Sequence, residues 1–554
     1  MNKKSLTVFL MFLVSFVLSQ MVLKTPSMKN DESEFSGKNA LEHIQEISKE
    51  PHSVFDYEAH ENVRKYIIET AGSFVGSDNV TERNYRSKAN VQPADGITFI
   101  REHDFEVDYD VRNVVVEIEG KNKIGMLLVA HYDSRGHVGN DGQLGGSYGA
   151  ADDGYGVATL LELIRLLSTK ELENSVYFLF ADAEETKMMG SKLEAQNTDL
   201  MNKVNFVLNV EARGVKGASY MFETSKNNNK VLELYEEANY PTTYSVATAV
   251  YTVMPNYTDF TSFLEIGKPG VNFAVLDSLD YYHNPKDNYE NVSPSSVQHY
   301  GEQILPMVLE YTSNAKYADM NYFIGTHDMI FFNLFSNLLI KYSETTGLIL
   351  TIILILGFIG LMVYAYRKNT FNLRTYGKQF AILGIMLLIA VVSGYLVSQY
   401  LSITNGIKWN LTNVNTKYAF AYFIGFMALM ITFISIYLKR KNKEEDNNHF
   451  IYAGITINLV LSLITNIALS GASFMFFVPA LIAVLVLVVR MFVNNKVAMQ
   501  VAYAVMILIN MLLFVPLIYS LYLAVTIGGL LALALLAYLP LTILIPNVIN
   551  QLQD

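Results

Sequence analysis

The sequence predicts an α/β domain with a mostly parallel mixed sheet and helices on both faces, followed by an all-α polytopic membrane domain. Of the 554 residues, 51% are hydrophobic and only 17% are charged. With a mean hydropathy of +0.23, this composition is too apolar for an ordinary soluble protein. In the first part of the chain, near-continuous apolar runs alternate with helical stretches, which is typical of a sheet covered on both faces.

Charge divides the chain into two parts. Residues 346–554 carry 12 Lys and Arg but only 4 Asp and Glu, a net charge of +8, whereas residues 1–345 carry a net charge of −19. An acidic part joined to an apolar, slightly basic tail excludes a nucleic-acid binder, which needs a basic surface. The chain contains no cysteine, so a thiol nucleophile, a thiolate metal site and a disulfide are excluded as well.

About seven membrane spans are predicted after residue 345, because a span needs about 20 apolar residues. The apolar runs are 347–366, 380–401, 418–438, 450–470, 472–489 and 497–546, and the last is long enough for two spans. Another apolar run, at about residues 5–23, is either an uncleaved anchor or a cleaved signal, and we favour the anchor because it is long enough to span.

The basic loops orient these spans. Lys and Arg gather at 367–378, 439–443 and 490–496, which fall on one side together with Lys3 and Lys4. The positive-inside rule makes this side cytoplasmic. We therefore expect an anchor or signal at 1–23, an extracytoplasmic domain at 24–345 and a membrane domain at 346–554. The expected location is the cell membrane or, in a eukaryote, an internal membrane with the domain on the lumen side.

Three features of the membrane part carry further expectations. The spans contain almost no ionisable residues, which argues against coupled transport. Asn458, Asn466 and Asn510 are expected to form hydrogen bonds between helices. The Phe-rich segment 328–342 has a one-sided helical pattern, so we expect a helix that lies either on the membrane surface or beneath the first domain.

Polar residues follow the predicted strands of the first domain. The strands are expected at 114–118, 124–130, 175–180 and 204–210, with a helix at 157–167. In such sheets, ligands bind outside the carboxyl ends of the strands. The polar fragments that follow are His131-Tyr132-Asp133, Asp152-Asp153-Gly154, Glu184-Glu185, Glu211-Ala212 and, later, Tyr282-His283.

Each fragment alone is common in a surface loop, a turn or a helix cap. Together, two histidines and several carboxylates at one sheet edge would repel one another unless a cation neutralised them. Imidazole and carboxylate ligands without thiolate suit zinc, with cobalt and manganese as alternatives. A carboxylate between two histidines can bridge two ions, and a carboxylate that binds no metal can move the proton of the attacking water. Glu184 and Glu185 suit this division, because successive residues point in different directions.

The order His-x-Asp, Asp-Asp-Gly, Glu-Glu, Asn-x-Glu-Ala and Tyr-His-x-x-x-Asp resembles metallopeptidase family 28, the di-zinc exopeptidases that include bacterial aminopeptidases and glutamate carboxypeptidase. A soluble part followed by a multi-span tail is most similar to the membrane branch, which contains the endoplasmic reticulum metallopeptidases and vacuolar membrane proteases. The stretches 256–260 and 282–293 also resemble that branch. The resemblance covers about residues 38–345 and implies a zinc exopeptidase fold, whereas it covers the tail only in architecture.

Carried over by position, the resemblance implies two zinc ions. The implied ligands are His131 and Glu211 for one ion, Glu185 and His283 for the other, and Asp152 as the bridge. Glu184 is implied as the general base, and Asp133 as the residue that orients the imidazole of His131. Asp153 competes with Asp152 for the bridging role, and the family pattern favours Asp152. Glu211 stands where many soluble relatives have Asp, which is a conservative difference.

The expected activity is peptide hydrolysis, with aminopeptidase polarity favoured by the net charge of −19 in residues 1–345. The alternatives are a carboxypeptidase, a single-zinc glutaminyl cyclase of the same fold, and a catalytically dead scaffold or transport protein. The expected partners are a peptide and the lipid bilayer, without nucleic acid, and the oligomeric state is not predicted. The Gly-rich loop 136–149 is a surface insertion or a lid carrying His137, and Asp259 and Asp287 are expected to fix loops behind the site.

Overall fold

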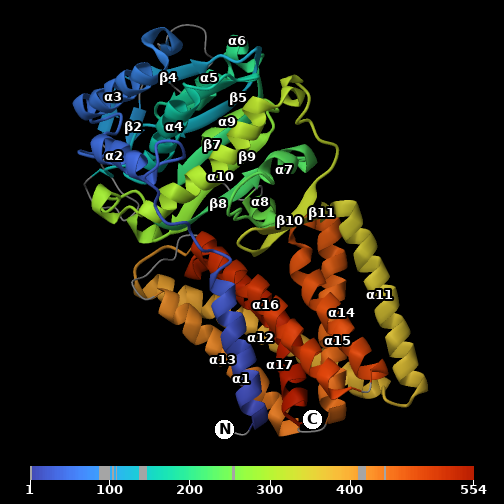
Figure 1. The fold of residues 1–554 in the computed structure, drawn as a ribbon. Helices are drawn as coiled ribbons and strands as arrows, with labels where there is room; N and C mark the ends of the chain where they lie inside the picture. The colour runs from blue at the N-terminus through green and yellow to red at the C-terminus, as the bar shows by residue number, and fades with distance from the viewer. Residues whose placement is uncertain are drawn as a thin grey trace. The chain divides into compact units, whose positions relative to one another are not determined.

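The computed structural model describes residues 3–85, 100–102, 105–107, 109–136, 146–251, 256–409, 419–441, 444–493 and 495–553 (Figure 1). The chain divides into two compact units. We call Lys24–Thr243 together with Val250–Met329 the sheet unit. Met1–Leu23, Tyr244–Ala249 and Ile330–Asp554 together form the helical unit.

A seven-stranded mixed sheet with the order β1-β4-β6-β5-β7-β9-β8 forms the centre of the sheet unit. Its strands are β1 (Val80–Tyr85), β4 (Val111–Ile118), β5 (Asn122–His131), β6 (Asn174–Ala181), β7 (Val204–Ala212), β8 (Lys216–Thr224) and β9 (Gly270–Asp277). The four central strands β6, β5, β7 and β9 are parallel, and antiparallel pairs flank them on both sides. The predicted mixed sheet is confirmed, and the four predicted strand runs lie within β4, β5, β6 and β7.

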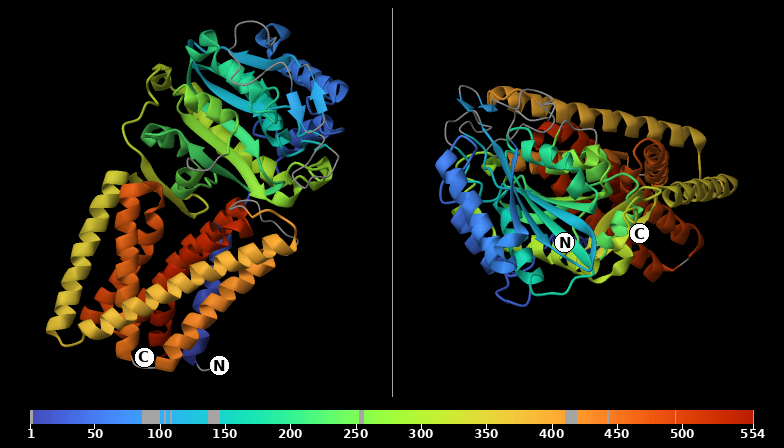
Figure 2. Two further views of the ribbon diagram at one scale, coloured as in Figure 1. Left: turned by 180° about the vertical axis from the view of Figure 1, so that it is seen from behind. Right: turned by 90° about the horizontal axis from the view of Figure 1, so that it is seen from above.

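Both faces of this sheet are covered. β6 and β7 are buried at every residue, and side chains alternate between the two faces of a strand, so neither face is open there. α4 (Gly154–Leu167) packs on β5 and β7 and contacts α10 (Pro294–Ser313), while α2 (Gly37–Ile47) and α3 (Tyr57–Val75) pack against α4. α9 (Asp259–Glu265) also packs on β5 and β7, beside α5 (Met189–Ala195). Figure 2 shows helices on both sides of the strands of this unit.

The cluster beneath α9 shows how the strand pattern selects a face. Leu127 and Val129 of β5 pack with Val207 of β7 against Phe260 and Phe263. These strand residues are two apart or sit in register on neighbouring strands, so they point to the same side. All five are fully buried. Apolar packing under α9 therefore holds this face of the strands whose ends carry the polar fragments.

Short elements complete the sheet unit and the boundary between the units. These are α6 (Thr198–Met201), α7 (Asn229–Tyr235), α8 (Ser245–Tyr251), the hairpin of β2 (Ile100–Glu102) and β3 (Phe105–Val107), and the 3₁₀ helices η1 (Ser77–Asn79), η2 (Leu279–Tyr281), η3 (Tyr289–Asn291) and η4 (Ala315–Ala318).

The helical unit contains eight long helices among its described residues. They are α1 (Lys3–Gln20), α11 (Glu344–Arg367), α12 (Leu373–Thr404), α13 (Ala419–Lys441), α14 (Glu444–Ala468), α15 (Phe474–Phe492), α16 (Lys496–Val525) and α17 (Leu530–Gln553), with the short η5 (Ser470–Ala472) and η6 (Ile527–Gly529). α11 to α17 are long and apolar enough to cross a membrane, which agrees with the predicted number of spans after residue 345. α1 packs against α16 and α17.

The prediction of a helix at 328–342 was wrong. The segment forms a β-hairpin of β10 (Met329–Phe335) and β11 (Leu338–Ser343). Its residues are largely aromatic or branched, which suits strands, and Phe332 pairs with Tyr244 in an antiparallel bridge and stacks on Phe474 at 4.6 Å between ring centroids. These contacts come from residues distant in the sequence, and they outweigh the local helical pattern.

The expected hydrogen bonds between membrane helices are found for one of the three asparagines. Asn466 Nδ2 donates to Thr351 Oγ1 of α11 at 3.1 Å. Asn458 and Asn510 instead donate to the carbonyl four residues earlier in their own helices, both at 2.8–2.9 Å. For Asn458 and Asn510 the prediction was wrong, because a buried amide can satisfy its donor inside its own helix.

His299 in α10 makes the sheet unit sensitive to acid. Its Nδ1 accepts a hydrogen bond from the Ser219 amide at 3.1 Å, and its Nε2 donates to the Tyr240 carbonyl at 2.9 Å, which requires the neutral ring. Burial lowers the pKa of His299 to about 4. The unfolded state therefore binds an extra proton below about pH 6.5, and stability should fall by up to roughly 3 kcal/mol as the pH drops towards 4.

Thermal unfolding of the full-length protein in detergent measures this effect. The pH values are 7.0, 5.5 and 4.5, which cover roughly the range in which histidine titrates. The control variant is His299→Gln, which keeps one hydrogen bond and cannot titrate. We expect the midpoint of the variant to fall less between pH 7.0 and 4.5 than that of the wild type. Equal falls in the two proteins would contradict this role for His299.

Candidate metal centre

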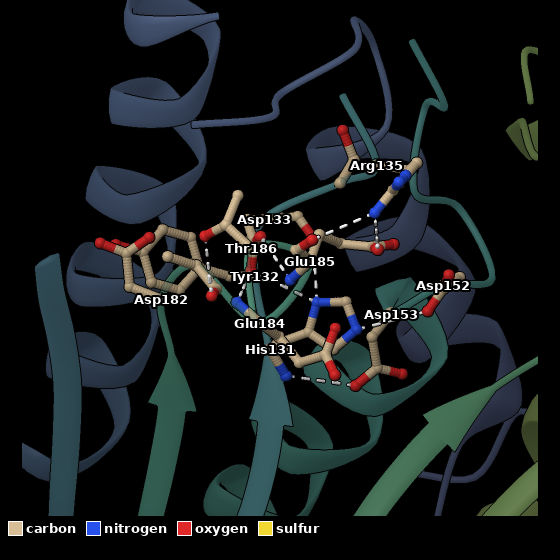
Figure 3. Close-up of polar contacts among 12 residues, drawn as sticks. His131, Tyr132, Asp133, Arg135, Asp152, Asp153, Asp182, Glu184, Glu185 and Thr186 are labelled. Atoms are coloured by element: carbon tan, nitrogen blue, oxygen red, sulfur yellow. Dashed lines mark hydrogen bonds and ion pairs between the residues drawn. The ribbon is translucent and has the colours of Figure 1, made fainter. Parts of the chain in front are cut away.

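Parallel strands bring the predicted site residues to one edge of the sheet. His131 is the last residue of β5, Glu211 lies at the end of β7, and Glu184 and Glu185 follow the end of β6. Because β5, β6 and β7 are parallel, their carboxyl ends lie at the same edge. Figure 3 shows the side chain of His131 between Asp133 and Asp152, close to the two glutamates.

Asp152 shares its carboxylate between two histidines. Its Oδ1 lies 3.3 Å from Nε2 of His131, and its Oδ2 lies 3.2 Å from Nε2 of His283. Nε2 of His131 also lies 3.7 Å from Glu211 Oε2, and Nε2 of His283 lies 2.9 Å from Glu185 Oε1. The five residues thus form two groups that share Asp152, and within each group the possible ligand atoms all lie within 4.8 Å of one another.

The electrostatics of these two groups call for positive charge. Burial alone would lower the pKa of His283, but Glu185 and Asp152 raise it to about 9. Burial alone would raise the pKa of Asp152, but His131 and His283 lower it. Since buried carboxylates are costly unless they are neutralised, a proton on each imidazole or a cation must balance them.

The donor set fits zinc. Nε2 of His131 and Oε1 of Glu185 are buried and have no hydrogen-bond partner among the described residues, so each leaves a lone pair directed into the site. Imidazole nitrogen and carboxylate oxygen are ligands that zinc accepts, and cysteine is absent from the chain. The residues present therefore fit zinc, and Asp152 belongs to both groups of possible ligands.

Asp153 occupies a different place from its neighbour. Its Oδ1 accepts a hydrogen bond from the amide of Gly156 at 3.0 Å and so caps the start of α4. Its Oδ2 accepts from the amide of His131 at 3.3 Å. It belongs to neither group of possible metal ligands. The structure therefore assigns the two adjacent aspartates to different contacts.

Asp287 holds the backbone that presents Asp152. Its carboxylate accepts hydrogen bonds from the amides of Ala151 at 2.7 Å and Asp152 at 3.2 Å, and from the hydroxyl of Ser147 at 3.2 Å. This contact agrees with the expectation that Asp287 fixes a loop behind the site. Asp259 differs, because both of its carboxylate oxygens are buried without a hydrogen-bond partner among the described residues.

Asp133 orients the site mainly through the backbone. Its two carboxylate oxygens accept the amides of Glu184 at 2.9 Å and Glu185 at 3.1 Å. Nδ1 of His131 lies 2.9 Å from the main-chain carbonyl of Asp133 and 3.5 Å from its carboxylate (Figure 3). The expected hydrogen bond to His131 therefore goes to the carbonyl, and the carboxylate instead fixes the turn that carries the two glutamates.

Glu184 lies beside the metal-binding groups without belonging to either. Burial, together with the nearby carboxylate of Glu211, raises the pKa of Glu184 well above its usual range. A carboxyl group with a raised pKa and no place among the ligands is suited to accept and release a proton. His137, the other candidate from the sequence, lies outside the described residues.

Sequence reasoning missed three residues that contact the ligands. Nη1 of Arg135 donates to the carbonyl of Glu185 at 3.1 Å and lies 3.3 Å from its carboxylate. Asn209 Nδ2 donates to Glu211 Oε1 at 3.3 Å, and the hydroxyl of Tyr300 donates to the carbonyl of Glu211 at 2.5 Å. Of these three residues, only Asn209 could have been recognised from the sequence, because it lies two residues before Glu211 and therefore on the same face of β7.

Known proteins share this domain. Residues 113–308 match Peptidase family M28. The chain is 26% identical to a putative endoplasmic reticulum metallopeptidase 1 of Schizosaccharomyces pombe over 66% of its own length and 44% of that protein. It is 29% identical to the endoplasmic reticulum metallopeptidase 1 of Rattus norvegicus over 64% of its length and 39% of that protein. A vacuolar membrane protease of Candida dubliniensis is 24% identical over 57% of the chain and 33% of that protein.

The chain thus spans less than half the length of these curated relatives. Among solved structures, a Zn-dependent exopeptidase from Parabacteroides distasonis covers 50% of this chain and 98% of its own, at 18% identity and a TM-score of 0.38. A glutaminyl cyclase of Porphyromonas gingivalis covers 50% of this chain and all of its own, at 20% identity and a TM-score of 0.39. Residues 113–308 therefore form a domain of the Peptidase family M28 type, and the curated relatives named metallopeptidase and protease support this match.

Proposed function

We propose that this chain is a membrane-anchored, zinc-dependent exopeptidase with aminopeptidase-type polarity. One observation carries the proposal. The two carboxylate oxygens of Asp152 lie beside two different imidazoles, 3.3 Å from one and 3.2 Å from the other. A carboxylate placed in this way can bridge two metal ions, which is the arrangement of hydrolytic two-metal sites.

In this proposal, His131 and Glu211 hold one zinc ion and Glu185 and His283 hold the other, with Asp152 shared. Zinc, when bound, polarises the carbonyl of the scissile peptide bond and acidifies the attacking water. The names of the relatives include metallopeptidase and protease, which supports a hydrolytic role for the same domain.

Glu184 supplies the proton transfer. It takes the proton from the attacking water as the new carbon–oxygen bond forms, and it returns the proton to the leaving nitrogen as the carbon–nitrogen bond breaks. Its raised pKa supports this role, because a base that must also act as an acid works best when its pKa is near the working pH. Asp133 keeps Glu184 in position by accepting its amide hydrogen.

Amino-terminal cleavage is favoured by charge. Residues 1–345 carry a net charge of −19, and the site itself is rich in carboxylates, which attract the free ammonium of a peptide. A carboxypeptidase would need positive groups to receive the terminal carboxylate.

We further propose that residues 24–345 face away from the cytoplasm, because the basic loops of the helical unit lie on the opposite side of the predicted spans.

A peptide digest with the purified full-length protein in detergent tests this function. Each substrate is offered in three forms, unblocked, N-acetylated and C-amidated, and the products are identified by mass spectrometry together with the zinc content per chain. We expect the unblocked and the amidated peptides to lose residues from the amino terminus, the acetylated peptide to stay intact, and about two zinc ions to be bound. Trimming from the carboxyl terminus would indicate a carboxypeptidase. One bound zinc together with cyclisation of an amino-terminal glutamine would indicate a cyclase. A protein with neither bound zinc nor turnover would be a scaffold.

A further inference from the structure

A cavity lies at the sheet edge opposite the metal centre. Its volume is about 410 Å³, within the range of small-molecule sites. β8 runs antiparallel to β9, so the end of β8 lies beside the start of β9, whereas the metal ligands lie at the carboxyl ends of the parallel strands. We call this cavity the far pocket. Its lining includes Glu223, Lys226, Leu264, Lys268, Phe323 and Ile324.

The lining of the far pocket includes one buried acidic side chain, one exposed basic side chain and several apolar side chains. Glu223 is 5% exposed, and Lys226 at the rim is exposed. No ion pair joins these two residues within the part of the chain that the structure describes. The other lysine is already engaged, because Lys268 Nζ donates to the carbonyls of Met201 at 2.6 Å and Val204 at 2.7 Å.

The apolar part of the lining comes from α9 and from the segment after η4. Leu264 belongs to α9, and Phe323 and Ile324 follow in the chain after η4. Ile324 is 62% exposed, so a ligand in the pocket would remove apolar surface from water. A buried acid, an exposed base and apolar side chains in the same lining match a small zwitterion with an apolar group.

A row of hydrogen-bonded side chains connects the far pocket to the metal centre. Asn209, Asn272 and Glu223 lie in register on β7, β9 and β8. Asn272 Nδ2 donates to Glu223 Oε2 at 3.0 Å, and Asn209 Nδ2 donates to Asn272 Oδ1 at 3.0 Å. Asn209 Nδ2 also donates to Glu211 Oε1 at 3.3 Å. We call this row the amide ladder.

The amide ladder is buried along its whole length. Asn209 and Asn272 are 0% exposed, so their hydrogen bonds are not exchanged with water. Hydrogen bonds that share groups polarise one another in a buried, low-dielectric environment, so a change of charge at one end alters the strength of the bonds along the row. A charge placed beside Glu223 therefore acts on the side chain that holds Glu211.

We propose that the far pocket binds a free α-amino acid with an apolar side chain, and that its occupancy alters the hold of Glu211 on its metal through the amide ladder. The ammonium group faces Glu223, the carboxylate faces Lys226, and the side chain packs on Leu264, Phe323 and Ile324. The coupling to the metal rests on the proposed function, whereas the binding does not. Amino acids of this kind are what an exopeptidase releases, so the pocket senses product.

Leucine titrated by calorimetry into the zinc-loaded full-length protein tests the binding. Glu223→Gln removes the charge and keeps an oxygen that accepts from Asn272, and Lys226→Gln changes only an exposed rim residue. We expect each variant to weaken leucine binding at this site at least about tenfold, and leucinamide and 4-methylpentanoate to bind the wild type at least about tenfold more weakly than leucine. Unchanged leucine affinity in both variants would overturn the proposal, because the leucine would then be bound elsewhere, including at the metal centre.

The rate of zinc loss to a chelator, with and without leucine, tests the coupling. We expect leucine to change the rate of zinc loss at least about threefold in the wild type, which is at the lower end of the couplings seen between two binding sites. In Glu223→Gln we expect leucine to leave this rate unchanged. If leucine binds as expected but the rate is the same with and without it, the coupling is wrong. If the binding pattern is seen but no peptide is hydrolysed, the proposed function fails and the far pocket stands.

Discussion

Peptide hydrolysis is expected to fall by a factor of about 10² to 10⁴ when Glu184 is replaced by glutamine, while the zinc content stays at the wild-type level. The variant keeps the size and shape of the side chain but cannot take a proton from water. Glu184 lies outside both groups of possible ligands, so its loss leaves the metal sites intact. The measurements are the rate of peptide hydrolysis at saturating substrate and the zinc content per chain.

The neighbouring variant Glu185→Gln is the matched control. Its carboxylate lies 2.9 Å from His283 Nε2, so this substitution is expected to lower the zinc content, whereas Glu184→Gln is not. The two substitutions are chemically identical and one residue apart, and they separate proton transfer from metal binding. Normal turnover in Glu184→Gln would remove this residue from the role of general base.

Asp152→Asn is expected to remove both zinc ions and to reduce hydrolysis to background. Asp152 is shared by the two groups of ligands, and an amide neither bridges two cations nor neutralises their charge. A change at His283 touches one group only, so its expected loss is smaller. Zinc per chain, measured after dialysis against metal-free buffer, is the readout.

Asp153→Asn controls for the position of Asp152. Asp153 caps α4 through the Gly156 amide, and asparagine is an equally good cap. The substitution loses only the longer hydrogen bond from the His131 amide at 3.3 Å, so this variant is expected to keep its zinc and its fold. If Asp152→Asn retains two zinc ions while Asp153→Asn loses them, the assignment of the bridge is reversed.

Much of the site was predictable, because most of the candidate ligands follow an apolar run that is typical of a buried strand or lie at the start of a helix. His131, Glu185 and Glu211 come after such runs, and parallel strands place their carboxyl ends together. The contacts of Asp133 were not predictable in detail. Its sequence neighbourhood indicates a partner for His131, but the carboxylate turns to the amides of Glu184 and Glu185, whose positions depend on the turn after β6.

The hairpin at β10 and β11 shows the same limit in the fold. The one-sided pattern of 328–342 is compatible with a helix, yet Phe332 pairs with Tyr244 and stacks on Phe474, which are about 90 and 140 residues away in the chain. Apolar periodicity describes a segment by itself, and it cannot report a partner supplied from elsewhere.

The sequence by itself predicted the seven apolar helices and the mixed sheet, because composition and run length are local properties of the chain. The order of its polar fragments indicated the candidate ligands through the family resemblance. Only the tertiary structure decided which of two adjacent aspartates lies between the histidines, and only it revealed the amide ladder from Glu211 to Glu223. These features depend on strand register and on distances between side chains far apart in sequence, and register is fixed only when the strands pack.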